Sequence, residues 1–291
     1  MRRTAALLLI LTLLLSGCQP AEVVPFTPTP GNQPTAGATV QVEAVTPVNT
    51  PDLPARQYCP SQSEDATQAY QAGLVAMNSR DLVLAEDSFR KALEADPGYC
   101  DAMDYLAILL RYQGKYEESL SWSQRSTEQN ANNPEPYDNL GTVAHYLERY
   151  DEAASAFETL MRLKPQDGRG PYGLARAVLA QGDLDRSLSL AQEAEKLFAN
   201  ETPLHKLDVM VLLGVIHYRR EEYSEAKRYL VPIIKLAKEV PYLSYILGVS
   251  YLYDSPPDAA QAQTYIEQAR EAGYTDIDPQ VETDLAEALD Q

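Results

Sequence analysis

A period of 34 residues runs through most of this 291-residue chain, and it restricts the fold more than any other feature of the sequence. Pairs of one apolar and one small residue recur at this spacing: Ala72-Gly73, Leu106-Ala107, Leu140-Gly141 and Leu174-Ala175. After a few inserted residues the same pair returns twice more, as Leu213-Gly214 and Leu247-Gly248. A period of about 20 to 50 residues indicates an array of stacked units in place of one globular core.

Each copy has the pattern of two paired helices. In the segment 138–148, the apolar residues Leu140, Val143 and Leu147 fall on one face of a helix. Small residues such as Gly141 and Ala153 allow the two helices of a pair to approach closely. Because one pair cannot bury its apolar face alone, stacked pairs must share a continuous core. The sequence therefore predicts an all-α array.

The pattern resembles the tetratricopeptide repeat over roughly residues 63 to 273. The period, the Leu-Gly pair, the small residue twelve positions beyond the glycine, and the turn prolines Pro97 and Pro165 carry the resemblance. Ala131 and Ala199 depart from it, because proline is expected at both positions. The resemblance implies a right-handed superhelix of about six helix pairs, near residues 66–99, 100–133, 134–167, 168–201, 207–240 and 241–274.

Both ends of the array have helix start signals. Asp278 followed by Pro279 predicts a helix over 278–290, whose apolar residues Val281 and Leu285 recur at helical spacing. We expect this helix to cap the solenoid. At the other end, Ser61 and Glu64 are expected to form a capping box that opens the first helix.

The first 18 residues have the pattern of an export signal. Arg2 and Arg3 precede an apolar run from Thr4 to Leu15, which is shorter than the ~20 residues that span a bilayer. The sequence Leu-Ser-Gly-Cys at 15–18 resembles the lipobox of bacterial lipoproteins. The resemblance implies that Cys18 is acylated and ties an extracytoplasmic protein to the bacterial cell membrane or outer membrane. The alternatives are an ordinary secretory signal and a cysteine that stands at this position by chance.

Residues 19–58 have the composition of a linker. They hold eight prolines among many Thr, Val and Ala residues and few charges. Proline favours extended backbone and removes a hydrogen-bond donor, so this stretch cannot pack a core. The sequence predicts a disordered Pro/Thr-rich linker followed by the solenoid domain, residues 59–291. A plain spacer and a spacer whose threonines carry sugars both fit.

Charge and composition exclude several classes of function. The chain has 24 Lys and Arg against 42 Asp and Glu, a formal charge of −18, and only three His and three Cys. It therefore lacks a basic surface for nucleic acid and a Cys/His framework for metal. Ser224 and Lys227 match the Ser-x-x-Lys of serine acyl enzymes, but no companion motif accompanies them. We predict no enzymatic activity, no cofactor and no metal site.

Cys59 and Cys100 remain once Cys18 is assigned to lipid. In the implied solenoid, Cys59 precedes the first helix and Cys100 opens the first helix of the second repeat, so the two lie at neighbouring helix starts. A disulfide is plausible if the chain is exported into an oxidising compartment. The alternative is two free thiols, with Cys100 partly buried.

The family resemblance also implies where a partner binds. In tetratricopeptide arrays the first helices line a concave groove, mainly through the second, fifth, ninth, twelfth and thirteenth positions of each repeat. In this chain those positions include Tyr70, Met77, Arg111, Tyr112, His145, Tyr146, Tyr172, Arg176, Tyr218, Arg219, Tyr242, Tyr245 and Tyr253. Tyrosine rings are rigid and amphipathic, so they suit peptide anchoring, although core packing alone also enriches tyrosine.

The leading hypothesis is a non-enzymatic, membrane-tethered adaptor. Its groove would bind a peptide or helix of another exported protein, with contact to the membrane through the lipid alone and none with nucleic acid. The alternative is a module that binds envelope polysaccharide or a small ligand with the same Tyr and Arg residues. A third hypothesis, an unrecognised enzyme, requires a compact cluster of perturbed titratable groups.

Overall fold

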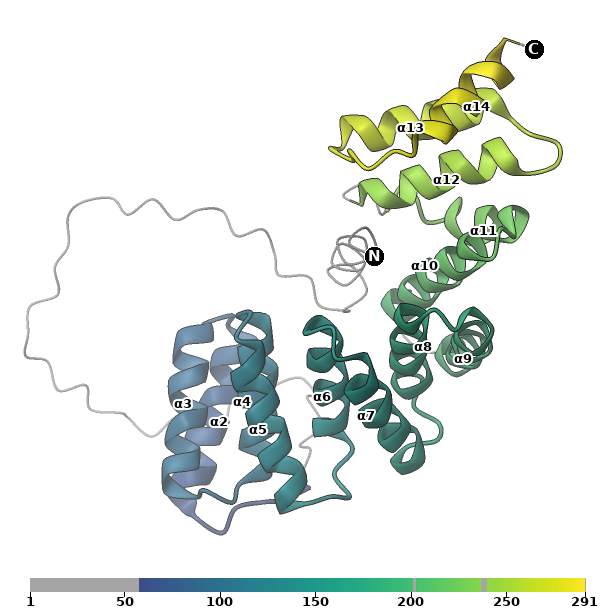
Figure 1. Ribbon diagram of the computed structural model, residues 1–291. Coiled ribbons are helices and arrows are strands. Elements are labelled where there is room, and N and C mark those ends of the chain that lie inside the picture. Colours follow the sequence, from purple (N-terminus) through teal and green to yellow (C-terminus); the bar gives the residue numbers. More distant parts are fainter. Residues whose placement is uncertain (1–57, 201–202, 237–239, 291) are drawn as a thin grey trace, which may run out of the picture.

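The computed structural model describes residues 58–200, 203–236 and 240–290 (Figure 1). Within these residues the regular structure consists of thirteen α-helices and one short 3-10 turn, without a strand. None of the helices in these ranges has the length and hydropathy that crossing a bilayer requires. The prediction of an all-α array is confirmed. The signal peptide with Cys18 and the linker up to residue 57 lie outside the described residues.

The helices form six consecutive antiparallel pairs and a final helix. The first helices of the pairs are α2 (Glu64–Asn78), α4 (Cys100–Tyr112), α6 (Glu135–Tyr146), α8 (Arg169–Gln181), α10 (Pro203–Arg219) and α12 (Pro241–Tyr253). The second helices are α3 (Leu82–Ala95), α5 (Tyr116–Gln129), α7 (Tyr150–Leu163), α9 (Leu184–Leu197), α11 (Tyr223–Leu230) and α13 (Ala259–Glu271). The turn η1 (Phe198–Asn200) follows α9, and α14 (Pro279–Leu289) ends the array. The pairs follow one another in sequence order, and their axes turn progressively from α2–α3 to α12–α13 (Figure 1).

A large side chain opposite a glycine sets the close contact within a pair. A Cβ added at Gly141 would lie 2.7 Å from the ring of Phe157, and one added at Gly173 would lie 2.2 Å from the same ring. The ring therefore fills space on both α6 and α8 that glycine leaves open. Where the sequence has Ala175 in place of this glycine, the facing residue shrinks to Ala191, and both are fully buried. The volumes are complementary, as dense core packing requires.

The turns inside the first five pairs share a left-handed residue. Gly114 and Gly182 adopt φ of 74° and 93°, and Arg80, Glu148 and Glu221 adopt φ of 59°, 58° and 61° at the equivalent positions of other repeats. A side chain at positive φ is strained, whereas glycine is not. The backbone of the turn is therefore kept even where the sequence does not offer glycine.

The helix starts differ from the prediction at one end. The first helix is capped by Ser63, whose side chain accepts a hydrogen bond from the Ala66 amide. The predicted capping box of Ser61 and Glu64 is wrong: the Ser61 hydroxyl accepts from the Ser63 amide at 3.0 Å, outside the helix. At the other end, Asp278 caps α14 as expected.

The apolar core is divided into three clusters. One spans α2 to α4, a second spans α6 to α8, and the third runs from α8 to α14. Between the first and second clusters, buried polar side chains lie on α5 and α6 together with the apolar Leu120 and Val143. Asn139 Nδ2 on α6 donates to Ser119 Oγ and Ser123 Oγ on α5 at 2.9 and 2.8 Å. We call this polar contact the α5–α6 junction.

Residues 58–61 form a strap across the ends of several helices. Cys59 is joined to Cys100 at the start of α4 by a disulfide, with 5.5 Å between the Cα atoms. The Tyr58 amide donates to Asp101 Oδ1 at 3.1 Å, and the Tyr58 carbonyl accepts from Asn130 Nδ2 at 3.0 Å. Lys164 Nζ lies 5.8 Å from the centroid of the Tyr58 ring. The strap therefore contacts both sides of the α5–α6 junction.

Candidate functional site

Aromatic side chains follow one another along the first helices of the pairs. Tyr116, at the start of α5, stacks on Tyr146 of α6 with ring centroids 5.1 Å apart. Tyr172 of α8 packs against the fully buried Phe198 with centroids 6.2 Å apart. On α12, Tyr245 stacks on Tyr274 at 4.8 Å. We use the name tyrosine row for six residues: Tyr116, Tyr146, Tyr172, Tyr218, Tyr242 and Tyr245.

Three arginines accompany the tyrosine row. The guanidinium of Arg111 on α4 lies 5.1 Å from the centroid of Tyr112, and that of Arg176 on α8 lies 5.7 Å from the centroid of Tyr172. Arg219 on α10 donates from Nη1 to the Leu179 carbonyl at 2.8 Å. Within the described residues, none of the three comes within ion-pair distance of a carboxylate. Cation–π contacts stabilise such cations but leave their N–H groups available for other acceptors.

Burial controls the protonation of the groups beside Arg176. Burial lowers the pKa of His145 to about 2, and the positive charge of Arg176 adds to the effect. His145 is therefore neutral at physiological pH. On α10, burial raises the pKa of Asp208 to about 7, although Arg176 opposes this shift. Arg176 thus lies among groups that carry little compensating charge near neutral pH.

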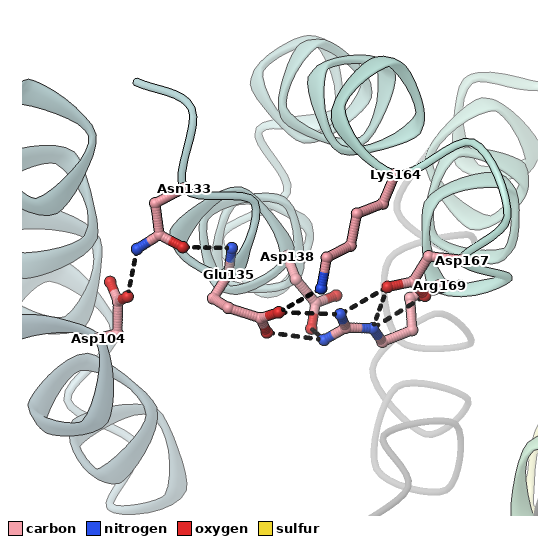
Figure 2. Close-up of polar contacts among 7 residues, drawn as sticks. All are labelled: Asp104, Asn133, Glu135, Asp138, Lys164, Asp167 and Arg169. Atoms are coloured by element: carbon pink, nitrogen blue, oxygen red, sulfur yellow. Dashed lines mark hydrogen bonds and ion pairs between the residues drawn. The ribbon is translucent and has the colours of Figure 1, made fainter. Parts of the chain in front are cut away.

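A cluster of charged side chains lies at the N-terminal ends of α6 and α8 (Figure 2). Arg169 donates from Nη1 to Glu135 Oε2 at 3.2 Å and to Asp138 Oδ2 at 3.0 Å, and from Nη2 to Asp167 Oδ2 at 2.6 Å. Lys164 Nζ lies 2.9 Å from Glu135 Oε1. We call these five side chains the Glu135 network. It connects the start of α6 with the loop that enters α8.

Opposite charges stabilise each other in the Glu135 network. Burial would raise the pKa of the Asp167 carboxyl, but hydrogen bonds and charge from Arg169 hold it below its ordinary value. The carboxylates likewise raise the pKa of Arg169 and of Lys164 against the effect of burial. The acids lie near the positive N-terminal ends of helices, which favours their charged form. The network is therefore a stable structural connection between two repeats.

Asn133 connects this network to the preceding repeat (Figure 2). Its Nδ2 donates to Asp104 Oδ2 on α4 at 2.6 Å, and its Oδ1 accepts from the Glu135 amide at 3.1 Å. Burial raises the pKa of Asp104 to about 7, although the hydrogen bond from Asn133 opposes this shift, and the charges of Asp101 and Glu135 add to the rise. Polar contacts therefore run across three successive first helices.

The structure divides the thirteen predicted groove residues by burial. Six of them are buried: Tyr70, His145, Tyr172, Arg176, Tyr242 and Tyr245. Met77, Arg111, Tyr146 and Tyr218 are half-buried, and Tyr112, Arg219 and Tyr253 are exposed. Tyr70 packs among Phe89, Tyr99 and Tyr105 in the first core cluster. The assignment of the thirteen residues to a partner-binding groove stays a prediction.

Several polar residues of the site were missing from the sequence-based set. Glu135 and Arg169 occupy the second position of their repeats and Asp138 the fifth, and Asp208 occupies a second position on α10. Their positions in the 34-residue period are groove positions, so the period could have identified them. The emphasis on aromatic residues passed over them.

The Ser-x-x-Lys sequence makes an interhelical contact. Ser224 Oγ donates to Asp254 Oδ1 at 2.8 Å, and Lys227 Nζ lies 2.5 Å from Asp254 Oδ2. Both side chains on α11 thus hold the end of α12. Among the described residues, no group of three or more His, Cys, Asp or Glu side chains is arranged to hold a metal ion.

Comparison with known proteins identifies the repeat. Tetratricopeptide repeat family models match residues 100–127 and residues 139–202. A comparison with curated proteins finds no match. Solved structures similar to this chain include a chain of the APC/C hetero-tetramer Cut9–Hcn1, with a TM-score of 0.63 and 17% identity over 77% of this chain. This chain spans 43% of that chain.

Two further solved structures are matched by this chain over nearly all of their own length. PilF of Pseudomonas aeruginosa is 18% identical, with a TM-score of 0.59 over 78% of this chain and 97% of PilF. YrrB, described as a tetratricopeptide protein with an unusual peptide-binding site, is 19% identical, with a TM-score of 0.52 over 71% of this chain and 100% of YrrB. At these identities the likeness shows the fold alone.

The fold is a tetratricopeptide solenoid, and the chain carries tetratricopeptide repeats. Proteins built from this repeat generally act as scaffolds for protein–protein interaction.

Proposed function

We propose that the protein is a non-enzymatic adaptor, tethered to the envelope membrane of a bacterium through acylated Cys18. In this proposal, the face formed by the first helices binds a peptide or helix of another exported protein during assembly of an envelope complex. The observation that carries the proposal is the tyrosine row with its three arginines, which follows the first helices of the solenoid from α4 to α12 and includes Tyr116 at the start of α5. The structurally similar YrrB has a peptide-binding site, which supports the choice of a peptide as the ligand.

Tyrosine and arginine are the residue types that interfaces use most as anchors. A partner segment laid across successive repeats would meet Tyr112, which is 40% exposed, then Tyr146, and at the far end Tyr253, which is 38% exposed. A solenoid suits this role because each repeat adds a similar stretch of surface.

Crosslinking in cells tests the role of this face. A photo-crosslinking residue is placed at Tyr146 on α6 in the full-length chain, and at Tyr265 on the second helix α13 as the matched control. We expect a discrete adduct with an exported protein from position 146 and none of the same mass from position 265. Tyr112→Ser combined with Tyr146→Ser should reduce copurification of that protein about tenfold, equivalent to roughly 1.4 kcal/mol. Equal adducts from both positions would contradict the proposal.

Fractionation of cells tests the tether independently. Cys18→Ser removes the only thiol that the lipobox offers for acylation, so the variant should leave the membrane fraction. The Cys59→Ser, Cys100→Ser variant keeps Cys18 and should remain in that fraction. Retention of Cys18→Ser at the membrane would refute lipid tethering without touching the role of the solenoid face. Immobilised envelope polysaccharide in place of peptide tests the alternative ligand.

A further inference from the structure

Arg111 and Arg176 differ from the other arginines that lack an ion pair. Arg80, Arg125 and Arg162 are exposed, so water hydrates their charges. Arg111 is half-buried, and its Nε has no hydrogen-bond partner; Arg176 is only 6% exposed, and its Nη2 has none either. A buried N–H without an acceptor has given up hydration without compensation. Both arginines therefore have an unused capacity to bind an acceptor.

The surroundings of these arginines favour an anionic acceptor. His145, on the helix between them, is 4% exposed and uncharged, and its Nδ1 also lacks a partner. Arg176 acts to lower the pKa of Asp208, but burial raises that pKa to about 7, so Asp208 competes weakly for Arg176 near neutral pH. Elsewhere in the described chain, arginines such as Arg90 and Arg186 are paired with glutamates. Arg111 on α4 and Arg176 on α8 are thus charges that are partly or wholly removed from water and have no carboxylate partner.

The helix spacing sets the length of a ligand that reaches both arginines. Neighbouring packed helices lie about 8–10 Å apart, so two steps from α4 over α6 to α8 span roughly 20 Å. An extended chain rises about 3.3 Å per residue, so about six residues cover this distance. Between the two arginines such a segment passes Tyr146, whose ring stacks on Tyr116.

We propose that this face binds an acidic extended segment of the partner, with carboxylates about six residues apart that pair with Arg111 and Arg176. The apolar side chains between those carboxylates lie against the tyrosine row, and Arg219 extends the positive line onto α10. This inference rests on the proposed peptide-binding function and specifies the chemistry of the peptide. It runs against the long-range field of a chain with formal charge −18, so only local pairing favours an acidic ligand.

Peptide binding to the purified full chain tests the inference. Three fluorescein-labelled 15-residue peptides contain the same Phe and Leu residues, interspersed with Glu, Ser or Lys, and all have amidated C-termini. We expect the Glu peptide to bind at least tenfold more tightly than the Ser peptide by fluorescence anisotropy in 150 mM salt. The Lys peptide measures attraction to the acidic body and should not lose affinity in the arginine variants.

Matched variants separate local pairing from net charge. Arg111→Gln with Arg219→Gln removes two charges from the first helices, and Arg186→Gln with Arg228→Gln removes two from the second helices. We expect the first pair to weaken binding of the Glu peptide about tenfold and the second pair to change it less than twofold. Arg176→Lys serves as a further variant because it keeps the charge but loses the planar donor geometry. It should weaken binding of the Glu peptide without changing the helical circular dichroism.

The outcomes distinguish this inference from the proposed function. The acidic ligand would be overturned if the two double arginine variants lost equal affinity for the Glu peptide. It would also be overturned if the Ser or Lys peptide bound as tightly as the Glu peptide and its binding were weakened by Tyr112→Ser with Tyr146→Ser. Either result would leave the proposed peptide binding intact. Binding of none of the three peptides would overturn both.

Discussion

Replacing Arg169 should destabilise the protein more than replacing Glu135, although the two residues are ion-pair partners. Arg169→Gln leaves Glu135, Asp138 and Asp167 around a single cation, Lys164. Glu135→Gln leaves Arg169 with two carboxylates and Lys164 without its partner. The first variant removes three of the four ion pairs and creates repulsion among acids, whereas the second removes two of the four and leaves two acids beside Arg169.

The burial of the network sets the size of both effects. The Glu135 side chain is 5% exposed and Arg169 24%, which places the network between a surface pair worth about 0–1 kcal/mol and a buried pair whose disruption costs about 3–5 kcal/mol. We expect a loss of about 2 kcal/mol in the free energy of unfolding for Glu135→Gln and about 3–4 kcal/mol for Arg169→Gln. Arg186→Gln, which breaks an exposed pair with Glu158, should cost less than about 1 kcal/mol.

The effect of pH provides the sharper test. In the native protein, Arg169 holds the pKa of Asp167 below its ordinary value, so this contribution is fully present above the unfolded pKa of about 4 and constant between pH 5 and 7.5. In Arg169→Gln the clustered acids have raised pKa values, and they bind protons in the folded state as the pH falls. The loss caused by Arg169→Gln should therefore shrink from pH 7.5 to 5, while that caused by Glu135→Gln should not.

Urea denaturation followed by circular dichroism at both pH values measures these losses. Arg169→Gln with Glu135→Gln completes a double-mutant cycle. The reasoning would be refuted if Arg169→Gln cost no more than Glu135→Gln, or if its cost did not depend on pH.

Three other perturbations follow from the same structure. The disulfide closes a loop with a sequence separation of 41 residues, so Cys59→Ser with Cys100→Ser should lower the free energy of unfolding by about 4 kcal/mol under the chain-entropy model. A reductant should lower the stability of wild type by the same amount and should not change that of the variant. Glu148→Gly should raise stability by about 0.5–1 kcal/mol because φ there is 58°, and a lowered melting temperature would contradict this. Asp104 keeps a proton to about pH 7 in the folded state but only to about pH 4 in the unfolded state, so the free energy of unfolding of wild type should fall as pH rises from 4 to 7. Asp104→Asn should reduce this slope and raise the free energy of unfolding by about 1–2 kcal/mol at pH 8. Parallel curves of stability against pH for wild type and variant would exclude the assignment.

The 34-residue period was sufficient to predict the helix pairs because each position has the same packing role in every copy. Gly141 and Phe157 illustrate this, since the spacing between them is also the spacing between Gly73 and Phe89. The prediction failed where the local cap chemistry had two candidates: Ser61 and Ser63 both suit an N-cap, and the structure uses Ser63.

The candidate site could be predicted only in part. The position of a residue in the repeat indicates which face of the helix it lies on, but not how far neighbouring side chains bury it. Tyr70 and Tyr112 both occupy groove positions, yet Tyr70 is 5% exposed and Tyr112 40%. Tyr70 is covered by Tyr99, the last residue of its own repeat, and by Tyr105 of the next repeat, so its burial depends partly on how two copies pack. The Glu135 network likewise depends on contacts between residues about 30 positions apart, which no single repeat encodes.

The strap and the α5–α6 junction are physically related. In a solenoid each repeat contacts mainly its neighbours, so one weak interface limits the cooperativity of the whole array. The α5–α6 junction buries Asn139 against serines, and such hydrogen bonds contribute only about 1 kcal/mol each after desolvation. Tyr58 contacts Asp101 before this junction and Lys164 beyond it. The strap therefore adds stability where the apolar core adds least, and losing the Cys59 crosslink should open this junction before the others.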